Sequence, residues 1–71
     1  MLTAASAPSV LVAASPDGNA LWRVDRDGSV HRTVDAKKWN RIGSVSRIEA
    51  FVADFDVAYA LTGTSLETIS V

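Results

Sequence analysis

The sequence predicts an all-β fold, an antiparallel β-meander of about seven short strands. Turn-forming residues recur at short intervals along the 71-residue chain, and the runs between them are rich in Val, Ile, Thr and aromatic residues, which favour strands. Asp27-Gly28 lies between two such runs and supplies the positive φ of a tight hairpin. Pro16-Asp17-Gly18 predicts a second turn, because proline presets φ and glycine relieves the backbone.

The elements follow from these turns in chain order. We expect strands near Val10–Ala14, Ala20–Asp25, Ser29–Val34, Lys38–Ile42, Arg47–Ala53, Val57–Leu61 and Leu66–Val71. A helix is conceivable only over Val45–Ala60, where apolar residues also follow helical spacing. We favour two strands there, because β-branched and aromatic residues are frequent and no convincing cap is followed by good helix formers.

A faint internal repeat runs through the chain. An offset of 37 residues aligns Trp22 with Tyr59, Val24 with Leu61, Ala13 with Ala50 and Asp17 with Asp54, and one deletion then aligns Ser29 with Ser65 and Val30 with Leu66. Such a period is typical of solenoids, propellers or arrays, whose single units cannot bury their own hydrophobic face. We divide the chain into an N-terminal extension (1–9), a first β-repeat (10–46) and a second, shortened β-repeat (47–71).

Three segments of the first repeat have a recognisable pattern: Leu21-Trp22-Arg23-Val24, Gly28-Ser29-Val30-His31-Arg32, and Trp39-Asn40-Arg41-Ile42 followed by Val45 and Ile48. This pattern resembles a tectonin-like β-propeller blade, with its Trp-x-Val strand, Gly turn, Trp-x-x-Ile strand and spaced aliphatics. The resemblance covers residues 10–71. The second repeat departs from it, because Tyr59 stands in place of Trp22 and the second Trp-x-x-Ile strand is missing.

The resemblance implies two propeller-type blades, with four strands in the first and three in the second. A typical propeller has four to eight blades, so the chain would be completed by oligomerisation. We therefore expect a homo-oligomer, with a trimer or a tetramer as candidate sizes. A compact single-chain β-barrel or sandwich with a coincidental repeat is the alternative architecture.

Composition excludes several classes of function. The absence of cysteine excludes disulfides, thiol catalysis and zinc–thiolate sites. A single histidine and scattered carboxylates predict no metal and no cofactor. A net charge of −1 gives no reason to expect nucleic-acid binding or membrane insertion. The first residues lack the features of a secretory signal, and no window is long enough for a transmembrane segment, so we expect a soluble protein, cytoplasmic or particle-associated.

Charge is unevenly distributed along the chain. Residues 1–47 hold seven Lys and Arg against four Asp, a balance of +3, whereas residues 48–71 hold four acidic residues and no basic one, a balance of −4. Such a chain is suited to pairing head to tail with copies of itself. A chance fluctuation in a short sequence is the alternative.

The candidate ligand contacts come from the resemblance, since tectonin-like members often bind glycans. It nominates Trp22, Arg23, Trp39, Arg41, Glu49 and Tyr59, with aromatic rings stacking on sugars and charged groups binding hydroxyls. The alternative is that the aromatic residues fill the space between sheets. Trp39 is the stronger candidate of the aromatics because Lys38, Asn40 and Arg41 flank it.

No residue pattern indicates catalysis. His31 has no nucleophile and orienting acid at a telling spacing, so we expect it to be an exposed strand residue. Asp25-x-Asp27-Gly28 lacks the later ligands of a calcium loop and is interpreted as a hairpin turn. We expect a non-enzymatic, lectin-like binding module. The alternative is a structural subunit of a virion, tail or coat that docks through its β-edges and complementary charge.

Overall fold

The computed structural model describes residues 9–71 and confirms the all-β prediction. Seven strands follow one another: β1 Ser9–Ala14, β2 Leu21–Asp25, β3 Ser29–Thr33, β4 Asn40–Ser44, β5 Ile48–Ala53, β6 Val57–Thr62 and β7 Leu66–Ser70. Within this part of the chain no helix is long and apolar enough to cross a membrane. The predicted N-terminal extension lies outside the described residues, except for Ser9, which begins β1.

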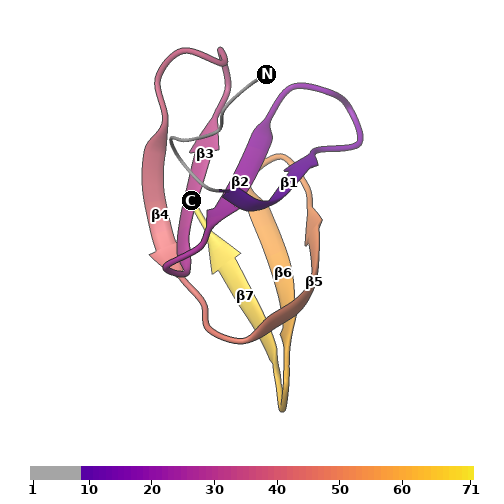
Figure 1. Ribbon diagram of the computed structural model, residues 1–71. Coiled ribbons are helices and arrows are strands. Elements are labelled where there is room, and N and C mark those ends of the chain that lie inside the picture. The colour runs from indigo at the N-terminus through magenta and orange to yellow at the C-terminus, as the bar shows by residue number, and fades with distance from the viewer. Residues whose placement is uncertain (1–8) are drawn as a thin grey trace.

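The strands form two antiparallel sheets, each a meander in chain order (Figure 1). Sheet I has the order β1-β2-β3-β4, and sheet II has the order β5-β6-β7. The sheets pack against each other with β1 near β5 and β4 near β7. We call the face that each sheet turns toward the other its inner face, and the opposite face its outer face.

One strand starts two residues later than the sequence predicts. We expected the fourth strand over Lys38–Ile42, and β4 spans Asn40–Ser44. The reason lies in the preceding turn, where the Asp35 carboxylate accepts hydrogen bonds from the backbone amides of Lys37 at 2.8 Å and Lys38 at 2.9 Å. These amides are held by the turn, so pairing with β3 begins beyond them.

The first three strands of sheet I recur, pair by pair, in sheet II. The β1–β2 pairs Leu11↔Val24, Val12↔Arg23, Ala13↔Trp22 and Ala14↔Leu21 correspond to the β5–β6 pairs Ala50↔Leu61, Phe51↔Ala60, Val52↔Tyr59 and Ala53↔Ala58. The β2–β3 pairs Trp22↔Arg32 and Val24↔Val30 correspond to the β6–β7 pairs Tyr59↔Thr68 and Leu61↔Leu66. Even the irregularity near the start of the first strand recurs, between Ser9 and Leu11 and between Ile48 and Ala50.

This correspondence equates Trp22 with Tyr59 and Val30 with Leu66, as the sequence alignment does. It corrects the alignment in the first strand, where Ala13 corresponds to Val52 rather than to Ala50. The cause is the turn between the first two strands, since six residues separate the paired residues Ala14 and Leu21 in sheet I and four separate the paired residues Ala53 and Ala58 in sheet II. β4 has no counterpart in sheet II.

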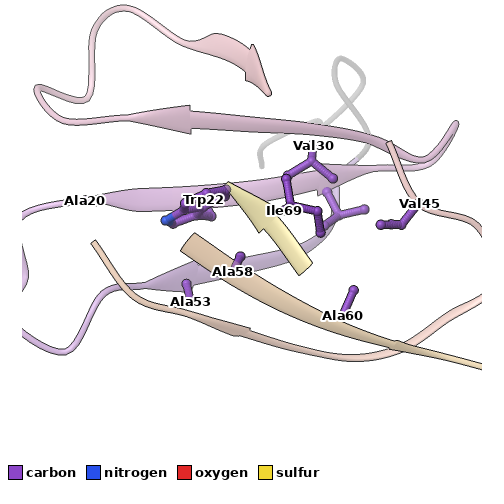
Figure 2. Packing of buried hydrophobic residues seen from close by; sticks show 9 residues of the cluster. Ala20, Trp22, Val30, Val45, Ala53, Ala58, Ala60 and Ile69 are labelled. Atoms are coloured by element: carbon purple, nitrogen blue, oxygen red, sulfur yellow. The ribbon is translucent and has the colours of Figure 1, made fainter. Parts of the chain in front are cut away.

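The core lies between the two inner faces (Figure 2). Trp22 is completely buried there, over the small side chains Ala53 and Ala58 of sheet II. Its indole Nε1 donates a hydrogen bond of 2.9 Å to the backbone carbonyl of Asp54. Its ring centroid lies 6.3 Å from that of Phe51. Because no surface of the ring is exposed, Trp22 is a core residue rather than the ligand contact that the sequence suggested.

Candidate ligand-binding site

A row of charged side chains crosses the outer face of sheet I. Successive residues of a strand point to opposite faces, so Trp22 and Val24 point inward while Arg23 and Asp25 of β2 point outward. The register pairs Arg23 with His31 of β3, and His31 with Arg41 of β4. Three strands therefore place two guanidinium groups, an imidazole and a carboxylate on one face.

Trp39 joins this face from the loop directly before β4. The loop is shaped by Thr33 and Asp35: the Thr33 hydroxyl accepts a hydrogen bond from the amide of Ala36 at 2.9 Å, and Ala36 has a φ of 65°. Hydrogen bonds from the backbone amides of Lys38 and Lys37, and then from the Thr33 hydroxyl, lower the pKa of Asp35 below its ordinary value of 3.8. The ionised carboxylate thus holds the loop that brings Trp39 to the sheet.

Arg23 connects the tryptophan to the charged row. Its guanidinium lies 4.6 Å from the centroid of the Trp39 ring, in a cation–π arrangement. The same guanidinium donates to both carboxylate oxygens of Asp25, from Nε at 2.7 Å and from a terminal nitrogen at 3.3 Å. These two contacts fix the position of a long side chain that would otherwise be free to move.

His31 is more enclosed than the sequence suggested. Only 19% of its side chain is exposed, because Arg23 and Arg41 flank it on the neighbouring strands. Its Nδ1 atom lies 3.4 Å from Asp25 Oδ2 but is buried without a hydrogen-bond partner. The expectation of an exposed strand residue was therefore wrong for His31.

The arrangement has the chemistry of a site for polyhydroxylated ligands. Arg23 and Arg41 supply hydrogen-bond donors, Asp25 supplies acceptors and Trp39 supplies an aromatic face. A sugar presents the matching groups, because its hydroxyls both donate and accept hydrogen bonds and its C–H groups form apolar patches.

Arg41 is exposed and lies near Asp27 in the β2–β3 turn. Hydrogen bonds from the Ser29 hydroxyl and amide, and then the charge of Arg41, lower the pKa of Asp27.

The remaining predicted contacts lie elsewhere in the single chain. Glu49 is an exposed residue of β5 near Gly63. Tyr59 of β6 is on the outer face of sheet II. The structure therefore brings Arg23, Trp39 and Arg41 together, and it separates them from Glu49 and Tyr59.

A groove of about 380 Å³ adjoins the same outer face. Ala14, Leu21 and Thr33 form its floor, and the turn residues Asn19 and Asp35 contribute polar walls. Neither this groove nor the membership of Asp25 and His31 in the charged row was predicted from the sequence. The row was accessible from the sequence, because strand alternation combined with the Asp27-Gly28 hairpin pairs Arg23 with His31.

In the described part of the chain, no group of three or more His, Asp or Glu residues is placed to hold a metal ion. Comparisons of the chain with protein-family models, with curated proteins and with solved structures find no match.

Proposed function

We propose that the protein is a non-enzymatic, propeller-like binding module that assembles with copies of itself and recognises glycans on the outer face of sheet I. The observation that carries the proposal is the Arg23–Trp39 stack, with the guanidinium 4.6 Å from the ring centroid and paired with Asp25 at 2.7 Å. This pair offers donors and acceptors beside an aromatic ring. Arg41 extends the donor set along the same row.

Self-association would raise the apparent affinity of individually weak sites. A single exposed sugar site of this size binds weakly, and several copies held in one particle multiply the apparent affinity when they engage one surface. We therefore expect binding to glycans displayed at high density, and much weaker binding to a free monosaccharide.

A glycan array tests the proposal with three forms of the protein. Trp39→Ala removes the aromatic face and Trp39→Phe keeps one, while the native mass of each variant reports whether assembly is intact. Loss of an aromatic contact worth about 1 kcal/mol lowers the affinity of each site roughly fivefold. We expect array signals to disappear for Trp39→Ala and to be largely retained for Trp39→Phe. Equal binding by Trp39→Ala and the native protein would remove Trp39 from the site.

A second function is favoured by a separate observation, the exposed apolar outer face of sheet II with Leu61, Leu66 and Val52. A structural subunit of a virion, tail or coat needs such a face and an unpaired sheet edge, and β7 supplies the edge. Co-fractionation of the protein with a large particle, together with no signal from any glycan on the array, would favour this role over the first.

A further inference from the structure

The outer face of sheet II is largely apolar, although no segment within residues 9–71 covers it. Across its three strands lie Ala50, Val52, Tyr59, Leu61 and Leu66, with Thr68 and Ser70 of β7 as polar side chains. The exposed fractions are 42% for Tyr59, 45% for Leu61 and 67% for Leu66. Repeat arrays normally end in a unit with a polar outer face, which keeps them soluble. Sheet II lacks such a face.

The register shared by the two sheets identifies what this face corresponds to. Tyr59, Leu61 and Leu66 occupy the positions of Trp22, Val24 and Val30. In sheet I these positions are on the inner face, and their exposed fractions are 0%, 1% and 0% because sheet II covers them. The two units are therefore stacked front to back, and the front of the second unit is left open.

The same correspondence identifies a surface that can cover it. Trp22 lies over Ala53 and Ala58, and Ile69 belongs to the same core cluster (Figure 2). The residues of sheet I that correspond to Ala53, Ala58 and Ile69 are Ala14, Leu21 and Thr33. These three form the floor of the 380 Å³ groove on the outer face of sheet I. The molecule thus carries an exposed copy of the side chain and, in the groove, a copy of the surface that receives it, in which Ala14 is exposed, Leu21 is half-buried and Thr33 is buried.

We propose that a second copy of this chain covers the outer face of sheet II with the outer face of its own sheet I, so that Tyr59 enters the groove lined by Ala14, Leu21 and Thr33. The opposite charge of the two segments supports this pairing, since residues 1–47 carry +3 and residues 48–71 carry −4. The contact joins two different surfaces, so it is head to tail and leaves one surface of each kind free for the next copy.

The inference rests on the self-association in the proposed function and does not depend on sugar binding. It also assigns a role to Tyr59, the predicted ligand contact that lies away from Arg23 and Trp39 in the single chain. The groove and the Arg23–Trp39 stack share one face of sheet I. Tyr59 of one copy is then placed beside the Arg23–Trp39 stack of the next. β4 has no counterpart in sheet II, so Trp39 and Arg41 stay at the rim of the contact.

Two substitutions, one on each surface, test the contact by sedimentation velocity. Tyr59→Arg places a charge on the inserted side chain, and Ala14→Trp fills the groove. Both positions are exposed in the single chain, so far-UV circular dichroism should match the native protein. Val71→Arg is the control, an exposed apolar residue beyond β7 that receives the same new charge. We expect an oligomer for the native protein and the control, and a monomer for Tyr59→Arg and Ala14→Trp.

Mixing the two variants distinguishes a head-to-tail contact from a symmetric one. Tyr59→Arg keeps an intact groove and Ala14→Trp keeps an intact tyrosine, so an equimolar mixture should form a dimer of one copy each and nothing larger. A monomeric native protein at micromolar concentration, an unchanged mass for Ala14→Trp, or a mixture that stays monomeric would each overturn the proposal. Glycan binding by a protein that is monomeric throughout would overturn this contact while leaving the sugar site standing.

Discussion

Replacing Trp22 by phenylalanine tests whether the core is built as the structure indicates. The indole Nε1 donates to the Asp54 carbonyl at 2.9 Å, and the ring is fully buried against Phe51 and the alanines of sheet II. Phenylalanine keeps an aromatic ring and removes the N–H group and two ring carbons. The substitution therefore separates the hydrogen bond and the extra volume of tryptophan from aromaticity itself.

The expected cost follows from these two losses. Two buried ring carbons contribute about 1.5 kcal/mol, at about 0.8 kcal/mol for each buried carbon. The hydrogen bond adds about 1 kcal/mol, since the carbonyl of the exposed residue Asp54 has access to water once it is unpaired. The sum is about 2–3 kcal/mol. A chain of this length has a total stability of about 4–10 kcal/mol, so this is a large fraction.

Urea unfolding followed by circular dichroism measures the cost. With a slope of about 1 kcal/mol per molar urea, the midpoint should fall by about 2–3 M. Tyr59→Phe is the matched control, because Tyr59 occupies the corresponding position but is exposed, and its change should stay within about 0.5 kcal/mol. Both variants are compared at one low protein concentration, because self-association would add its own stabilisation. Equal midpoints for Trp22→Phe and the native protein would refute the assigned burial.

Two further predictions concern the turns. Gly28 has a φ of +92°, and a Cβ there would collide with the carbonyl oxygen of Val45, whereas Gly18 has a φ of +77° and open space around it. Gly18→Ala should therefore cost about 1 kcal/mol and Gly28→Ala about 2–4 kcal/mol in urea unfolding, and equal costs would contradict the close approach of Val45. Asp35 has a lowered pKa, so its contribution to stability is present above the ordinary pKa of 3.8 and is lost as pH falls through the folded-state pKa. Asp35→Asn should accordingly be less stable than the native protein at about pH 7, with the difference shrinking toward about pH 2, and a difference independent of pH would exclude this linkage.

The strands were predictable because their signals are local. Asp27-Gly28 and the Pro16 turn fix hairpins through backbone conformation and hydrogen bonds within each turn, and the β-branched runs between turns leave little choice of structure. The start of β4 was misplaced because it depends on how the Asp35 carboxylate caps the preceding loop, which a propensity pattern does not contain.

The candidate site was only partly predictable, because burial depends on which face of a sheet meets another. Trp22 and Trp39 were both candidate ligand contacts in the sequence, yet one is in the core and the other lies on the outer face of sheet I. Trp22 and Tyr59 even occupy the same position of the repeated unit and differ completely in exposure. Strand alternation shows that Trp22 and Arg23 point to opposite faces, but only the packing of sheet II decides which face is covered.

The sizes of the side chains are compatible with the proposed contact between two copies. Within the chain, the large Trp22 lies over the small Ala58, and the corresponding pair between copies would join the smaller Tyr59 to the larger Leu21. Close packing tolerates such exchanges when the total volume is kept. Arg23 is the apparent exception, because it stands where sheet II has Ala60, a small residue under the stacked unit.

The contacts of Arg23 explain how a long side chain can stand at the position of the small Ala60. Its guanidinium is drawn toward Trp39, at 4.6 Å from the ring centroid, and is anchored by Asp25 at 2.7 Å. The long side chain therefore extends along the sheet toward β4 instead of standing upright in the path of a second copy. On this reasoning the Arg23–Trp39 stack would have two effects. It would place the candidate sugar site at the rim of the proposed contact between copies, and it would keep the Arg23 side chain away from the surface that Tyr59 of the next copy contacts. Arg23→Lys, which cannot form the same two-point contact with Asp25, should therefore weaken assembly as well as glycan binding.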